Sequence, residues 1–167
     1  MKSIVVYYSK SGNTRAVAEL IAKRLECKVF PVNLMEKKGR GTKEERNMEK
    51  ELYDNAVQES VNCDLAVIGT PTGFQRAKSM IQRFVRDVQA DAVVLFCTYD
   101  NKIGTTLTDL ENTLTERGIE VIQTMGLGTL KPGEFGELEG PRRSGYIDRI
   151  NNFVELCKVG LEHAARK

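Results

Sequence analysis

The sequence predicts a three-layer α/β protein in which a doubly wound sheet of five parallel strands is covered by helices on both faces. Five short apolar runs are bounded by turn residues and show no strict alternation, which is typical of parallel strands buried on both faces. Stretches with apolar residues at helical spacing follow these runs, so strands and helices alternate along the chain. With 167 residues, the chain is long enough for one core, and we expect one domain over residues 1–167.

The first strand, Ile4–Tyr8, is followed at once by a polar loop and a helix. Apolar residues then recur at helical spacing, so the helix is expected to begin near Asn13. The loop Ser9–Thr14 is rich in hydroxyl groups, and Gly12 lets its backbone turn tightly. Unpaired N–H groups and the positive end of the helix dipole favour anions at such a junction. The pattern predicts a phosphate-binding loop, and an ordinary strand–helix turn with a capping residue is the alternative.

The next two elements are a strand at the sheet edge and a charged helix. The second strand is expected at Cys27–Leu34, where Pro31 indicates an edge because proline cannot donate a hydrogen bond to a neighbouring strand. The helix is expected over Lys43–Ser60, mostly as a solvated face. Its narrow apolar stripe contains Met48, Leu52 and Ala56.

The rest of the chain repeats the alternation three times. Strands are expected at Leu65–Gly69, Ala92–Cys97 and Ile119–Met125. Apolar spacing predicts helices over Met80–Val88, Leu107–Leu114 and Tyr146–Ala165. An irregular loop at Lys131–Gly145, rich in glycine and proline, is long for a strand–helix connection.

Composition and charge exclude several classes of function. Lys and Arg number 25 against 23 Asp and Glu, a balance that argues against a nucleic-acid partner. No apolar run is long enough to span a membrane and no signal segment is recognisable, so we expect a cytoplasmic protein. The four cysteines include no C-x-x-C pair, and His163 is the single histidine. The sequence therefore predicts neither a disulfide framework nor a metal site.

The loop Ser9–Thr14, with the sequence SKSGNT, resembles the phosphate-binding signature of flavodoxins, Ser/Thr-x-Thr-Gly-x-Thr, which follows their first strand. Ser11 replaces the middle threonine and keeps its hydroxyl group. Neither a P-loop motif nor a Gly-x-Gly-x-x-Gly between a strand and a helix occurs. The resemblance implies the flavodoxin-like strand order 2-1-3-4-5, with ligands beyond the carboxyl ends of the strands. It also implies FMN as the cofactor.

The same resemblance implies that the FMN phosphate lies on the first loop and the ring between the loops after the third and fourth strands. Phe74 and Tyr99 are each the one aromatic residue of their loop and could lie against the ring; alternatively, Phe74 caps the core and Tyr99 lies at the sheet edge. The absence of tryptophan departs from many flavodoxins. The residues expected to bind FMN are Ser9, Lys10, Ser11, Gly12, Asn13, Thr14, Thr70, Pro71, Thr72, Gly73, Phe74, Thr98, Tyr99 and Asp100.

Some residues near the ring have narrower expected roles. Gly73, without a Cβ, could turn its peptide toward the ring edge, or it could be a simple turn glycine. Cys97 is expected to be a small buried residue, with a redox thiol as the alternative. Asp100 would disfavour an anionic reduced flavin and Lys10 would offset part of that effect. No side chain is expected to be catalytic, because the cofactor carries the chemistry in such proteins.

Three functions are consistent with these residues. The first is an electron carrier that binds FMN and exchanges electrons with a redox partner protein. The second is an FMN-dependent reductase that takes hydride from NAD(P)H and reduces a quinone or another small acceptor. The near-neutral charge and the Lys131–Gly145 loop, which could cover a substrate or form a subunit interface, favour this reading. The third is a flavin-free interaction scaffold. The oligomeric state is left open.

Overall fold

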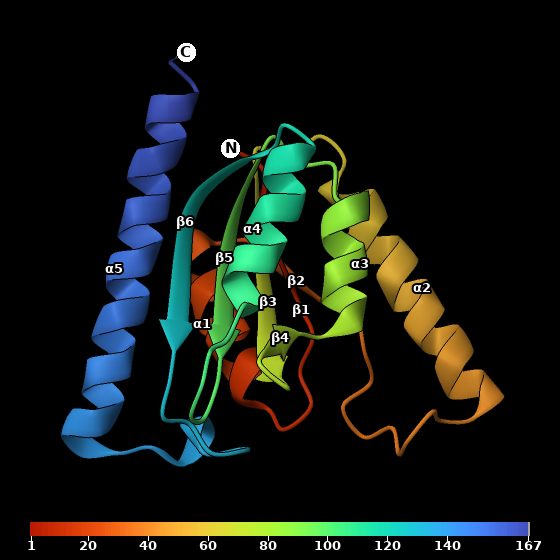
Figure 1. The fold of residues 1–167 in the computed structure, drawn as a ribbon. Coiled ribbons are helices and arrows are strands. Elements are labelled where there is room, and N and C mark those ends of the chain that lie inside the picture. Colours follow the sequence, from red (N-terminus) through yellow and green to blue (C-terminus); the bar gives the residue numbers. More distant parts are fainter. Residues whose placement is uncertain (167) are drawn as a thin grey trace.

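The computed structural model describes residues 1–166 and confirms the predicted fold class (Figure 1). A parallel sheet has the strand order β2-β1-β3-β5-β6. This is the predicted order 2-1-3-4-5, in which β5 and β6 are the fourth and fifth parallel strands. The two-residue strand β4 is additional and pairs antiparallel with β3. The strands are β1 (Ser3–Tyr7), β2 (Lys28–Pro31), β3 (Leu65–Gly73), β4 (Arg76–Ala77), β5 (Ala92–Thr98) and β6 (Glu120–Leu127).

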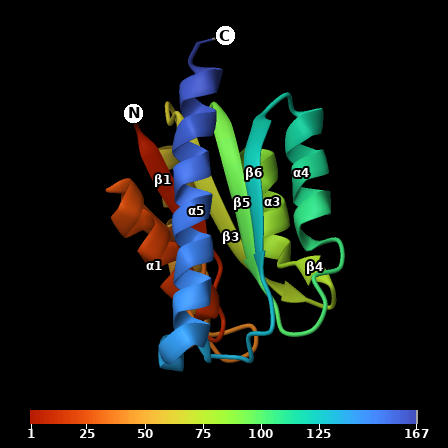
Figure 2. The ribbon, with the colours of Figure 1, turned by 90° about the vertical axis from the view of Figure 1, so that its left-hand side faces the viewer.

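Helices cover both faces of the sheet. Figure 2 shows α1 and α5 side by side on one face, and the other three α-helices pack on the opposite face. A single 3-10 turn, η1 (Phe135–Glu137), follows β6. The α-helices are α1 (Asn13–Leu25), α2 (Lys43–Ser60), α3 (Ser79–Asp87), α4 (Thr106–Glu116) and α5 (Gly140–Ala164).

The central strands carry unbroken apolar runs, such as Ile4–Tyr7 and Leu65–Ile68, because each strand contributes to two cores. In β1, Val5 and Tyr7 face the core under α1 and α5. Ile4 and Val6 point to the opposite face, into the core under α2, α3 and α4. Side chains alternate between the faces of a strand, and each fully buried aliphatic side chain contributes about 1.5–3 kcal/mol. The unbroken apolar runs therefore follow from burial on both sides.

The edge position of Pro31 is confirmed. Strand β2 is at the end of the sheet and pairs with β1 alone, with Pro31 opposite Tyr7. Because β2 has no neighbouring strand on its other side, the missing N–H of Pro31 interrupts no hydrogen bonds there.

The apolar stripe expected on α2 is confirmed at Ala56, is half-buried at Leu52 and is wrong at Met48. Met48 is 52% exposed, and the buried face contains Glu49, Tyr53, Ala56 and Ser60. The buried polar side chains have internal partners: the Glu49 carboxylate accepts from the Leu34 N–H at 2.8 Å, and the Tyr53 hydroxyl donates to Asp87 at 2.5 Å. Counting apolar residues alone does not identify a buried face that contains both polar and apolar side chains.

Two segments expected to be loops are regular. The last helix begins at Gly140, six residues before the expected start, because Pro141 lies in its first turn, where a missing N–H costs nothing. Strand β3 continues through Gly73 and turns into β4. Phe74 and Gln75 form this turn with φ of 50° and 61°, a hairpin conformation that usually selects Asn or Gly.

Within residues 1–166, no helix is long and apolar enough to cross a membrane.

Candidate functional site

A cleft of about 470 Å³ lies where the carboxyl ends of the parallel strands meet. The strand arrowheads in Figure 1 point toward this end of the molecule. The three loops expected to converge do so, because each contributes side chains to the same cleft. The lining residues are Lys10, Ser11, Asn13, Pro71, Thr72, Lys78, Thr98, Tyr99, Asp100, Leu130 and Pro132.

Ser9 organises the first loop from inside. Its side chain is buried, and its Oγ accepts hydrogen bonds from the Gly12 N–H and the Arg15 N–H, both at 3.2 Å. Gly12 has φ of 104°, a left-handed conformation that a residue with a Cβ rarely adopts. These bonds use the Ser9 oxygen as an acceptor and shape the loop, and the expected bond from its hydroxyl hydrogen to a phosphate stays a prediction.

Asn33 holds the same loop from the edge strand. Its Oδ1 accepts from the Ser9 N–H at 2.9 Å, and its Nδ2 donates to the Ser9 carbonyl at 2.6 Å. Both residues are buried. Asn33 is not among the residues predicted from the sequence, although a polar residue at the carboxyl end of the second strand is a usable signal.

Asn13 joins the first loop to the segment after β6. Its Nδ2 donates to the Lys131 carbonyl at 2.8 Å, and its Oδ1 accepts from the Phe135 N–H at 2.9 Å. The buried Asn13 amide is therefore used inside the protein. What Asn13 leaves for a ligand is its backbone N–H.

Thr14 joins the first loop to the end of β5. Its hydroxyl lies 3.0 Å from the hydroxyl of Thr98, and both side chains are buried. Either oxygen could be the donor. When Thr98 donates, the Thr14 hydroxyl hydrogen is free for a ligand.

The start of α1 is an anion site. Among residues 1–166, no acceptor receives the N–H groups of Ser11, Asn13 and Thr14, whereas Ser9 satisfies that of Arg15. The first N–H groups of a helix have no partner within the helix and carry a partial positive charge. The hydroxyls of Ser11 and Thr14 add donors. This arrangement fits a phosphate group.

The second segment is a rigid hairpin in place of the expected open loop. Thr70 is buried, and its Oγ1 accepts from the Lys78 N–H at 3.2 Å. The Thr72 hydroxyl lies 2.9 Å from the Thr106 hydroxyl at the start of α4. At the tip, the Gln75 carbonyl accepts from the Thr105 N–H at 2.9 Å. The hairpin is thus fixed to α3 and α4.

Phe74 is fully exposed at the tip of this hairpin. It does not cap the core, and it lies outside the cleft lining. Gly73 has no left-handed φ; a Cβ on Gly73 would lie 3.0 Å from the Lys78 Nζ. The missing Cβ therefore leaves room for the Lys78 ammonium group.

Tyr99 lies over the edge strand β6 and also lines the cleft. A Cβ on Gly128 would come within 2.5 Å of its ring, and one on Gly126 within 3.2 Å. The ring therefore lies close against bare backbone. Tyr99 therefore lies both at the sheet edge and in the cleft, and its ring is half-buried.

Charged groups of both signs line the cleft. Lys10 and Asp100 are exposed, and Lys78 is half-buried. The sequence analysis missed Lys78, Leu130 and Pro132. The signal for the last two was their place directly after the fifth parallel strand, whose carboxyl end meets the same edge.

Arg142 has a structural role in the segment after β6. Its guanidinium forms an ion pair with Glu134 and donates to the Thr129 carbonyl. The guanidinium and the Lys131 N–H, in that order, hold the pKa of Glu134 below its ordinary value. The segment expected to be irregular is therefore fixed by this pair and by Asn13.

Cys97 is a buried structural residue. It is fully buried, and burial raises the pKa of its thiol to about 12. A thiol that stays protonated at neutral pH is a poor nucleophile and redox group. Within residues 1–166, no cluster of His, Cys, Asp and Glu could hold a metal ion.

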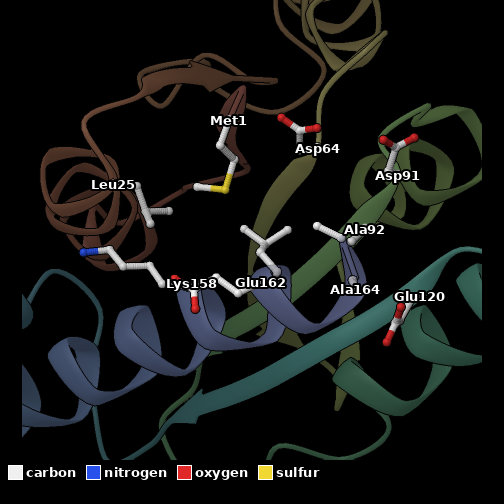
Figure 3. A pocket seen from close by; sticks show the side chains of 11 residues that line it. Met1, Leu25, Asp64, Asp91, Ala92, Glu120, Lys158, Glu162 and Ala164 are labelled. Atoms are coloured by element: carbon white, nitrogen blue, oxygen red, sulfur yellow. The ribbon is translucent and has the colours of Figure 1, made fainter. Parts of the chain in front are cut away.

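A larger hollow, of about 780 Å³, lies at the opposite end of the sheet (Figure 3). Asp64, Asp91 and Glu120 stand there at the starts of three neighbouring strands, beneath the last turns of α5. The Asp64 carboxylate accepts from the backbone N–H of Lys2 at 2.6 Å. It therefore satisfies a backbone donor at the start of the chain. The site with converging donors is the cleft at the carboxyl end.

In α/β proteins with a doubly wound sheet, the usual ligand site lies at the carboxyl edge, where the loops of this chain also converge. The particular fold is that of the flavodoxins. The chain is similar to a flavodoxin from the domain Archaea (18% identity, 99% of this chain and 98% of that one, TM-score 0.57). It is also similar to the flavodoxin of Megasphaera elsdenii (20%, 78% and 88%, 0.54) and to a flavoprotein in complex with FMN from Lactobacillus acidophilus (17%, 75% and 92%, 0.52). No protein-family model and no curated protein matches the chain.

Proposed function

We propose that this protein binds FMN in the carboxyl-end cleft and transfers electrons through it. The observation that carries the proposal is the open start of α1, where the N–H groups of Ser11, Asn13 and Thr14 have no acceptor within residues 1–166. These groups fit a phosphate dianion. The similarity in fold to flavodoxins, and to a flavoprotein whose structure contains FMN, supports the choice of ligand.

The residues divide by the part of FMN that they would hold. The first loop, with Lys10 at its exposed side, would take the phosphate. Pro71, Thr72 and Tyr99 line the rest of the cleft and would contact the ring. Phe74, although outside the lining, stands at the tip of the neighbouring hairpin and would reach the ring at its exposed side.

FMN, when bound, supplies the redox chemistry. The protein supplies binding, orientation and charge. No nucleophilic thiol serves the cleft, because the nearest cysteine, Cys97, is buried with a raised pKa.

The test compares FMN with riboflavin, which lacks the phosphate. Donors to a charged group each contribute about 1.5–3 kcal/mol, so FMN should bind at least a hundredfold more tightly. Quenching of flavin fluorescence gives both dissociation constants. Equal affinities would overturn the proposed phosphate site, and failure to bind either ligand would favour a flavin-free scaffold.

A second candidate function is an FMN-dependent NAD(P)H reductase. The cation Lys78, which lines the cleft and forms no ion pair within residues 1–166, favours it, because a cation assists the formation of a negatively charged reduced ring. The FMN-loaded protein should be mixed anaerobically with NADPH or NADH. Rapid bleaching of the flavin absorbance supports the reductase, and a stable oxidised spectrum supports a carrier that another protein reduces.

A further inference from the structure

Lys78 places a positive charge at a defined point of the cleft. It precedes α3, and its N–H is held by Thr70 Oγ1 at 3.2 Å. Its Nζ lies 6.0 Å from the centre of the Tyr8 ring. On the other side it approaches Gly73, where a Cβ would lie 3.0 Å away. The ammonium group therefore occupies a slot between β1 and the hairpin.

No counter-charge meets this ammonium group. Within the described residues, Lys78 forms no ion pair, and its Nζ donates no hydrogen bond to protein. Two other cations near this end of the sheet are paired, Lys37 with Glu49 and Arg142 with Glu134, whereas Lys10 in the cleft lining is exposed to solvent. The Tyr8 ring is its one cation–π contact within residues 1–166, and a ring face at 6.0 Å offsets only part of the hydration that a half-buried ammonium loses. Its place in the cleft points to a negatively charged partner outside the chain.

The ammonium reaches the cleft from a different segment than the phosphate donors. The N–H groups of Ser11, Asn13 and Thr14 belong to the loop after β1, whereas Lys78 follows β3 and β4. Pro71 and Thr72, which would contact the ring in the proposed FMN site, belong to the same β3–β4 hairpin that leads to Lys78. The charge of the phosphate is already met by the start of α1.

We propose that Lys78 is a charge-stabilising residue that favours the reduced, anionic form of the FMN ring. This inference rests on the proposed binding of FMN. Two electrons and one proton, as a hydride from NAD(P)H delivers them, convert the neutral oxidised ring to a reduced ring with one negative charge. A cation beside the ring lowers the energy of that charge and leaves the oxidised form nearly unaffected.

The test measures how tightly the protein binds oxidised and reduced flavin. Lys78→Met removes the charge at similar length, Lys78→Arg keeps it, and Lys50→Met removes one charge from the exposed face of α2 as a matched control. Dissociation constants for FMN and for riboflavin are measured anaerobically, before and after reduction with dithionite. Thermal unfolding by circular dichroism establishes that each variant is folded.

Lys78→Met should weaken the binding of reduced FMN about tenfold, as expected for one charge pair at a half-exposed site. Oxidised FMN should change by about twofold or less. Riboflavin should show the same difference between its two forms, because the effect is on the ring. Lys78→Arg should restore most of the loss, and Lys50→Met should have no effect.

Three results would overturn the inference. Equal weakening of oxidised and reduced FMN, with riboflavin unchanged, would assign Lys78 to the phosphate. If Lys78→Met has the same dissociation constants as Lys50→Met, Lys78 has no role toward the ring. A loss that Lys78→Arg does not restore would show a role in packing. Failure of the unmodified protein to bind FMN is a separate result that refutes the proposed function itself.

Discussion

The two ends of the cleft are built differently. At the proposed phosphate end, buried side chains are already bonded to the protein: Asn33 to the Ser9 backbone, Asn13 to the segment after β6, and Thr14 to Thr98. At the proposed ring end, Phe74 is fully exposed, and within residues 1–166 the Lys78 ammonium forms no ion pair and contacts only the face of the Tyr8 ring at 6.0 Å. Under the proposed function, the phosphate end is preorganised and would supply affinity. The ring end keeps Phe74 and Lys78 available and would set how bound FMN behaves.

The largest expected effect comes from breaking the phosphate end at Asn13. Asn13→Ala removes the side chain that bonds the Lys131 carbonyl and the Phe135 N–H. Unpaired buried polar groups are costly, so unfolding free energy should fall by about 2–4 kcal/mol. Urea denaturation followed by circular dichroism measures this change.

The matched control is Asn47→Ala, because Asn47 is exposed on α2. This substitution should change the unfolding free energy by less than about 0.5 kcal/mol. If both variants unfold at the same urea concentration, the two Asn13 hydrogen bonds contribute nothing, and the phosphate end is not preorganised in the way inferred from the structure.

The same contrast explains what the sequence could predict. The strands were found because burial on two faces leaves an unbroken apolar run such as Leu65–Ile68. The first loop was found because its residues are consecutive. Asn33 and Lys78 were missed because each acts from a different segment, and only the strand order brings them to the cleft.

Local signals also misled where tertiary contacts decide. The turn at Phe74 and Gln75 contains neither Asn nor Gly, yet it forms, because the Gln75 carbonyl bonds the Thr105 N–H. Pro141 suggested a loop, although a helix tolerates proline in its first turn. In both places the general preference of the residue type holds on average, but the position of the residue in the fold decides the structure.

A smaller effect is expected at the bond between the first loop and β5. Thr14→Val removes a proposed phosphate donor and should weaken FMN binding about tenfold. Thr98→Val removes only the partner of that donor and should cost about threefold, because the Thr14 hydroxyl loses its fixed orientation. Isothermal titration of the apoprotein measures both constants.

Riboflavin is the matched ligand for this pair of variants. Neither substitution should change its affinity, because it carries no phosphate. If Thr14→Val weakens riboflavin and FMN equally, the hydroxyl acts on the fold of the cleft as a whole. The separation of the cleft into a phosphate end and a ring end would then be wrong.

The smallest expected effect is on the strained turn at the ring end. Phe74 and Gln75 have φ of 50° and 61°, and a left-handed conformation costs a bulky residue about 1 kcal/mol or more. Asparagine tolerates this conformation, so Phe74→Asn should raise the unfolding free energy by about 0.5 kcal/mol. The same variant should weaken FMN binding two- to tenfold if the ring contact is real, since such contacts contribute about 0.5–1.5 kcal/mol.

Gln75→Asn is the control: it should stabilise the turn to a similar extent and leave FMN affinity unchanged, because Phe74 is kept. A Phe74→Asn variant that is more stable and binds FMN as tightly as the unmodified protein would remove Phe74 from the flavin site. It would leave Tyr99 as the aromatic contact of the ring in the cleft.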